Sequence, residues 1–184
     1  MPKSPIWSQE KYLTAYHFAA RAHRGQKVAK TGLPYLLHIT FVTMEVIALL
    51  EVEKFKDPDL MVQCAILHDV IEDARVKKTR LEELFGKGVA QGVDLLSKKK
   101  KIKNKEKRFI EYIDRLEGAP KAIQSVKLAD RISNLQEPPF HWAQKKIANY
   151  LEKSKVIQEK LGHASSYLSN RMLKKMRDYE QYLE

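Results

Sequence analysis

Leu67-His68-Asp69-Val70-Ile71-Glu72-Asp73 is the stretch of sequence that decides the fold, because it carries four titratable residues at the end of an apolar segment. Residues 61–67 are almost entirely apolar, and Asp57-Pro58 is a strong helix-start signal. The segment from Asp59 to Asp73 is therefore predicted to be one central, mostly buried helix.

The titratable residues of this stretch have the spacing of a metal site. On a helix, His68 and Glu72 are four residues apart, as are Asp69 and Asp73, so the two pairs lie on adjoining faces. Burying four such groups without a partner would cost considerable free energy. A divalent cation would satisfy them, and imidazole together with carboxylate suits Mn, Fe or Zn.

A second polar cluster lies in the apolar segment 127–134, where Asp130 and Asn134 are also four residues apart. Taken alone, this pair leaves two interpretations open: a metal ligand, or an aspartate that caps a helix or pairs with Arg131. His38 by itself is weaker still, since a lone histidine on an apolar helix is usually a hydrogen-bonded core residue.

The rest of the sequence predicts an all-α protein. No segment shows sustained period-two alternation of β-branched residues, and seven Gly and seven Pro are few for a chain full of β-turns. Ser8 is a candidate N-cap, and Thr79 with Glu82 forms a capping-box pattern. Besides 59–73, the expected helices cover 9–23, 34–50, a short stretch from 79 to Gly86, 89–96, 108–117, 121–135, and two helices within 142–182 separated near Gly162.

Length and composition limit the domain organisation and the environment that the sequence is compatible with. With 184 residues, no visible linker and no internal repeat, we expect a single compact domain over 1–184, with a motif-bearing core of about 10–140 and C-terminal helices over 141–184. The one cysteine, Cys64, is expected to be a buried, inert thiol, and the lack of disulfides fits a reducing cytoplasm. We see no signal peptide and no membrane span. The net charge of +11 favours a polyanionic partner.

Taken together, the ordered pattern of His38, His68-Asp69 and Asp130 resembles the signature of the HD phosphohydrolase superfamily. The sequence is more specifically similar to the hydrolase domain of the RelA/SpoT proteins and to their small stand-alone relatives, the alarmone hydrolases. The similarity covers about residues 10–140. It rests on residues 19–26 (AARAHRGQ), 32–38 (GLPYLLH), 65–73 (AILHDVIED), Phe85-Gly86 with Val89-Ala90, and 126–131 (VKLADR) with Asn134.

This resemblance implies an all-helical fold and a concrete chemistry. One Mn²⁺ ion is expected at His38, His68, Asp69 and Asp130, where it would lower the pKa of a bound water and polarise a phosphoryl oxygen. Family members remove the 3′-pyrophosphate from ppGpp or pppGpp, giving GDP or GTP and pyrophosphate. The roles implied for the remaining residues are general acid–base action on the attacking water for Glu72 and Asp73, and nucleotide binding for Tyr35 and Asn134.

Several basic residues near these motifs are candidates for binding phosphate: Arg24, Lys27, Lys30 and Arg131. After Gly25-Gln26, however, the family usually has an Arg-Lys pair that packs on the guanine base, whereas this sequence continues with Lys27. Lysine cannot stack as a guanidinium does, so a different nucleotide is an alternative substrate, such as NADPH, from which the 2′-phosphate would be removed. A non-catalytic module that binds a nucleotide or RNA is a further alternative.

Residues 98–108 contain eight Lys or Arg and one acidic residue, Glu106. One interpretation is a solvated surface loop. The other is a segment that steers a polyphosphate substrate to the site. Because no aromatic residue interrupts the lysines, a stacking platform for single-stranded nucleic acid is disfavoured. We therefore expect a phosphorylated small molecule as the ligand, no membrane partner, and a homo-oligomer only as an open possibility.

Overall fold

Side-chain caps set where several of the helices begin. The computed structural model describes residues 5–28 and 31–183. Ser8 Oγ accepts a hydrogen bond from the Lys11 N–H at 3.3 Å at the start of α1, as predicted. Asp57 Oδ1 accepts from the Leu60 N–H at 2.9 Å, with Pro58 in the first turn of α3. Asn104 caps α5, so this helix begins inside the basic run, three residues before the predicted start.

All regular structure in the described residues is helical, which confirms the all-α prediction, and the only β-type pairing recorded there is an isolated bridge between Lys27 and Pro34. None of these helices is both long enough and apolar enough to cross a membrane. The helices are α1 (Gln9–Ala22), α2 (Leu36–Val52), α3 (Pro58–Leu67), α4 (Lys78–Leu96), α5 (Lys105–Glu117), α6 (Lys121–Asn134), α7 (Gln144–Leu161) and α8 (Ser166–Tyr179), with short 3₁₀ turns at Gly162–Ala164 and Glu180–Tyr182.

Helix α3 ends earlier than predicted, at Leu67 rather than at Asp73, and residues 68–74 form consecutive turns. The His68 imidazole provides the physical reason. Its Nδ1 lies 2.8 Å from the carbonyl oxygen of Ala65, the group that a continuing α-helix would pair with the next turn. The Val70 N–H then bonds to Leu67 at 3.1 Å in a tighter pattern. The motif thus lies at a helix end and not along a helix face.

Helix α4 also differs from the prediction. It begins at Lys78 with Lys77 at the cap position and no side-chain capping bond, so the expected capping box of Thr79 and Glu82 is not formed. Thr79 already lies inside the first turn, where it is too late to act as the cap. Gly86 interrupts the helix as predicted, because its φ of +82° and ψ of 166° are not helical, and such a positive φ is accessible to glycine. Helical structure then continues to Leu96.

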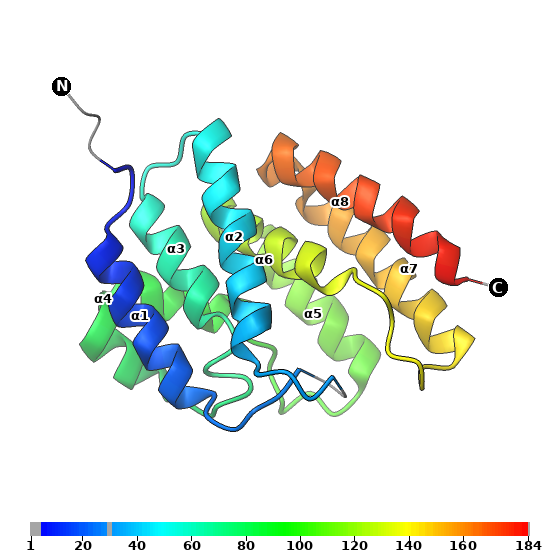
Figure 1. Ribbon diagram of the computed structural model, residues 1–184, viewed down its shortest axis with the longest axis horizontal. Helices are drawn as coiled ribbons and strands as arrows, with labels where there is room; N and C mark the ends of the chain where they lie inside the picture. Colours follow the sequence, from blue (N-terminus) through cyan, green and yellow to red (C-terminus); the bar gives the residue numbers. More distant parts are fainter. Residues whose placement is uncertain (1–4, 29–30, 184) are drawn as a thin grey trace.

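The helices are arranged in two groups around α6 (Figure 1). Helices α1, α2 and α3 lie side by side on one flank, and α7 and α8 lie together on the other. Helix α2 packs on both α3 and α6, and α6 also contacts α7 and α8. One cluster of buried apolar side chains takes residues from all eight helices. It includes Cys64, whose burial is as predicted.

The last helix is fixed to the first half of the chain by polar contacts. Glu53, just after α2, accepts hydrogen bonds at the start of α8 from Ser165 Oγ and from the Tyr167 N–H, at 3.1 and 2.8 Å. In the middle of α2, the buried Glu45 carboxylate binds the Arg171 guanidinium of α8 through two nitrogens. These contacts hold α8 against the helix that carries His38.

Candidate metal centre

Three separate parts of the chain converge on one point. His38 comes from the first turn of α2, His68 and Asp69 from the turn that follows α3, and Asp130 from α6. Because α2 packs on both α3 and α6, the fold brings these elements together. The four residues predicted as metal ligands are therefore neighbours in the structure.

The distances between their polar atoms are short. The two imidazole Nε2 atoms, of His38 and His68, are 3.1 Å apart. Asp130 Oδ1 lies 3.3 Å from His38 Nε2, and Asp69 Oδ2 lies 2.9 Å from His68 Nε2. His38, His68 and Asp130 each offer a ligand atom within 4.8 Å of the other two, and Asp69 joins them through both imidazoles.

Both histidines are oriented by a hydrogen bond on the far side of the ring. His68 Nδ1 lies 2.8 Å from the Ala65 carbonyl, which can only accept, so Nδ1 carries a proton. His38 Nδ1 lies 3.2 Å from Ser133 Oγ. A partner on Nδ1 fixes the ring and leaves Nε2 for a metal ion. Ser133 was not predicted as a site residue, since only the packing of α6 on α2 reveals the contact.

The carboxylates set the charge of the cluster. Burial lowers the pKa of His68, but the neighbouring Asp69 and Asp130 outweigh that effect and raise the pKa to about 9. Burial also opposes ionisation of the two aspartates. His68 nevertheless holds the pKa of Asp69 below its ordinary value, and Lys127, with the two histidines, holds the pKa of Asp130 well below its ordinary value. Both aspartates are anionic at neutral pH and attract a cation.

Tyr35, Lys127 and Asn134 bond directly to the two aspartates. The Tyr35 hydroxyl donates to Asp69 Oδ2, while Lys127 Nζ lies 2.5 Å from Asp130 Oδ2. Asn134 Nδ2 donates to Asp130 Oδ1 at 2.7 Å. In the structure, therefore, the two residues predicted to contact the nucleotide, Tyr35 and Asn134, hold predicted metal ligands. Lys127, which is buried and pairs with Asp130, is a functional candidate that the sequence did not single out.

Glu72 and Asp73, the predicted acid–base residues, lie in the same turn but in different surroundings. Glu72 accepts hydrogen bonds from Lys98, whose backbone N–H is 3.0 Å from Oε2. Asp73 is exposed, and its backbone N–H bonds to the Asp69 carbonyl at 2.8 Å. Although the Asp73 side chain reaches solvent, partial desolvation by the surrounding groups, with the nearby Asp69 and Glu72 carboxylates, raises its pKa above the ordinary value.

The predicted phosphate-binding residues are less tightly grouped. Lys27 is exposed in the loop between α1 and α2, and Lys30 lies outside the described residues. Arg131, also considered for phosphate, is buried, and its guanidinium lies 4.3 Å from the ring centroid of Tyr150 in α7. Asp130 pairs with Lys127 and not with Arg131, so the expected ion pair with Arg131 was wrong, while a role of Arg131 in phosphate binding stays a prediction that its burial does not favour.

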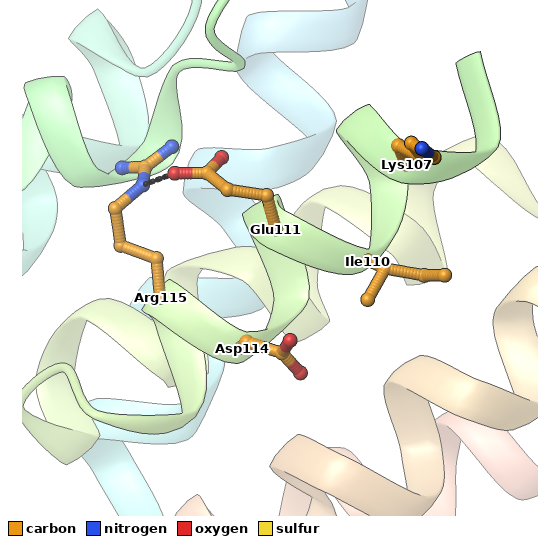
Figure 2. A pocket seen from close by; sticks show the side chains of 5 residues that line it. All are labelled: Lys107, Ile110, Glu111, Asp114 and Arg115. Atoms are coloured by element: carbon orange, nitrogen blue, oxygen red, sulfur yellow. Dashed lines mark hydrogen bonds and ion pairs between the residues drawn. The ribbon is translucent and has the colours of Figure 1, made fainter. Parts of the chain in front are cut away.

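Two surface hollows lie elsewhere. One is a shallow depression on α5, shown in Figure 2, where Arg115 Nε donates to Glu111 at 3.3 Å. The other lies between α1, α3 and α4, beside the ion pair of Lys11 and Asp59. None of the predicted metal ligands lines either hollow.

The geometry defines a class of protein: a helical fold with a buried cluster of two histidines and two aspartates from three distant segments. Comparison with known families agrees, since the HD domain family matches residues 15–161. The chain belongs to the HD domain family.

Named relatives refine this classification. The human protein named guanosine-3′,5′-bis(diphosphate) 3′-pyrophosphohydrolase MESH1 is 30% identical over 76% of this chain and 78% of its own length. The bifunctional (p)ppGpp synthase/hydrolase SpoT of Escherichia coli is 35% identical over 66% of this chain, which spans only 17% of that larger protein. A solved structure, described as a metazoan ortholog of SpoT that hydrolyses ppGpp, matches with a TM-score of 0.82 at 24% identity, covering 96% of this chain and 98% of that one.

Proposed function

We propose that this protein is a divalent-metal-dependent hydrolase that removes the 3′-pyrophosphate of ppGpp or pppGpp, giving GDP or GTP and pyrophosphate. The observation that carries the proposal is the convergence of His38, His68, Asp69 and Asp130. The names of relatives that share most of the chain length supply the substrate.

The residues present fit a metal ion. The Nε2 atoms of His38 and His68 face each other at 3.1 Å. If both rings were neutral and protonated at Nδ1, the Nε2 lone pairs would repel each other, so a proton or a cation is needed between them. His38, His68 and Asp130 each offer a ligand atom, and these atoms lie within 4.8 Å of one another, close enough to share one ion. The mixture of nitrogen and oxygen ligands suits Mn²⁺, the ion we propose, although Fe²⁺ and Zn²⁺ share this preference.

When bound, the ion would supply a water of lowered pKa and polarise a phosphoryl oxygen. The remaining work falls to the chain. Tyr35 and Lys127 hold the two aspartates in place. Asp73, exposed in the same turn, is suited to accept a proton from the attacking water, and Glu72 to orient the reacting groups.

The charge of the protein suits such a substrate. Phosphates are attracted by the net charge of +11 and by the lysines of the loop 98–104, which lies beside Glu72. We further propose that residues 1–184 act as one domain, with the core 10–140 carrying the site and the helices of 141–184 supporting it, and that the reaction takes place in the cytoplasm.

The test is a turnover assay of the purified chain with Mn²⁺ against ppGpp, pppGpp and NADPH, repeated after EDTA. Release of pyrophosphate from ppGpp, lost in EDTA and restored by Mn²⁺, is the expected result. Asp69→Ala should lower kcat at least about 100-fold, because it removes a ligand that also positions His68. Full activity of Asp69→Ala would show that the site is assigned wrongly.

The same panel separates the alternatives. Orthophosphate released from NADPH, with ppGpp untouched, would favour the phosphatase suggested by the replacement of the family's Arg-Lys pair. Tight RNA binding with a steep salt dependence and no turnover of any nucleotide would favour a binding module.

A further inference from the structure

Both oxygens of the Glu72 carboxylate are engaged by one residue of the basic loop. Lys98 donates its backbone N–H to Oε2 at 3.0 Å, and its Nζ lies 3.3 Å from Oε1 and 3.4 Å from Oε2. Lys100 Nζ adds a bond to the Glu72 backbone carbonyl. The loop is thus attached to the turn that carries His68 and Asp69.

The position of Lys98 is itself fixed from a second side. Its Nζ lies 5.2 Å from the ring centroid of Tyr112, a buried residue of α5 whose hydroxyl donates to the Leu96 carbonyl at 2.8 Å. Lys127 Nζ lies 5.3 Å from the same ring. One aromatic ring therefore supports two ammonium groups, each of which pairs with a different carboxylate of the site, Glu72 and Asp130.

The next residue in the loop is arranged differently. Lys99 Nζ binds Glu111 at 2.5 Å, on the face of α5 seen in Figure 2. Lys98 and Lys99 thus have the same charge and adjacent places in the chain, but only Lys98 contacts the turn of the metal centre in this way. This contrast provides a matched pair of variants.

We infer that Lys98 is a positioning residue for the proposed hydrolysis, holding the Glu72 carboxylate in the orientation that the reaction requires. A carboxylate that accepts three hydrogen bonds from one lysine is fixed in place. Glu72 therefore orients the reacting groups, and the exposed Asp73 is left as the proton acceptor. This inference rests on the proposed function.

The experiment compares Lys98→Gln with Lys99→Gln in the full chain, using ppGpp and Mn²⁺. Each variant removes one positive charge from the loop, so any loss of electrostatic steering should raise KM similarly in both. Lys98→Gln should in addition lower kcat about tenfold or more, since misplacing a reacting group costs that much. Lys99→Gln should keep kcat within about twofold of the wild type, because its partner, Glu111, belongs to α5.

Two further measurements separate positioning from general damage. In a Glu72→Gln background, Lys98→Gln should lower kcat no further, because it acts through a carboxylate that is already gone. The Mn²⁺ dissociation constant, measured by calorimetry, should be unchanged in Lys98→Gln, since Lys98 pairs with Glu72 and not with a predicted ligand. If Lys98→Gln fails to fold, Lys98→Arg, which keeps a cation beside Glu72, should retain more kcat than Glu72→Gln.

If the wild type hydrolyses ppGpp but Lys98→Gln and Lys99→Gln have equal kcat, the positioning role of Lys98 is overturned. An additive loss of kcat in the Glu72→Gln background would overturn it as well. Neither result would affect the proposed function. A wild-type protein that releases no pyrophosphate from ppGpp would overturn the proposed function, and the role of Lys98 with it.

Discussion

His68 carries a proton that any metal ion must displace. In the metal-free protein, Asp69 and Asp130 raise the pKa of His68 to about 9, above its ordinary value of 6.5. The protonated ring is therefore favoured in the fold. The stability it contributes to the metal-free protein is complete below pH 6.5 and is lost as the pH rises through about 9.

From this we predict that Mn²⁺ binding at pH 7 releases about one proton, and that the apparent affinity rises roughly tenfold per pH unit until it levels near pH 9. Calorimetric titrations in two buffers of different ionisation enthalpy measure the proton count directly. Binding with no proton released at pH 7 would contradict the assignment of His68 as a ligand.

At the residue scale, the resemblance of the ordered polar residues to the HD family predicted the four that converge, His38, His68, Asp69 and Asp130, whereas the residues taken singly left His38 and Asp130 open. The side chains that bond to these four residues could not be predicted from the sequence pattern. Ser133 meets His38 across 95 positions of sequence, a contact that depends on how α6 packs on α2. The Tyr35 bond to Asp69 likewise depends on the path of the loop before α2.

At the scale of elements, apolar runs and caps predicted where most helices lie, and the errors have local causes. The end of α3 was predicted too late in the sequence. His68 bonds to the Ala65 carbonyl and pairs with Asp69 instead of continuing the helix. The start of α5 was predicted too late in the sequence, because Asn104 lies within the basic run and was not recognised as an N-cap. Such competition between side chains and backbone is decided by tertiary contacts.

The tight crossing of α3, α4 and α6 gives a prediction at this scale. A Cβ at Gly92 of α4 would lie 2.6 Å from Cys64 Sγ and 2.7 Å from Ile123 Cδ1. Gly92→Ala should therefore lower the free energy of unfolding by about 1–2 kcal/mol, because overpacking outweighs the gain in helix propensity. Denaturant unfolding followed by circular dichroism measures this change.

Gly118→Ala is the matched control. Gly118 has an ordinary negative φ, and the nearest atom to its added Cβ is 3.8 Å away, so stability should be unchanged or slightly raised. Equal losses in the two variants would show that the crossing is not tightly packed.

At the scale of the whole molecule, a buried carboxylate joins the two flanks. Glu45 of α2 is 3% exposed and depends on Arg171 of α8. Arg171→Met should lower the free energy of unfolding by about 2 kcal/mol, less than for a fully buried pair because the arginine is partly solvated. Thermal or denaturant unfolding of the full chain measures the loss.

Adding Glu45→Gln should restore part of that stability, since it removes the unpaired charge. A double variant less stable than Arg171→Met alone would argue against the ion pair as the cause. The hydrogen bonds of Glu53 at the start of α8 are untouched by these changes and serve as an internal reference.

The pairing of Glu45 with Arg171 also affects how the chain folds during its translation. The two residues are 126 positions apart, and all four predicted metal ligands precede Arg171 in the sequence, so they are synthesised before the arginine. Until then the helix that carries His38 has a charge it cannot bury. A product whose translation stops before α8 would therefore keep that helix loosely docked and accessible to proteases, even with every ligand present.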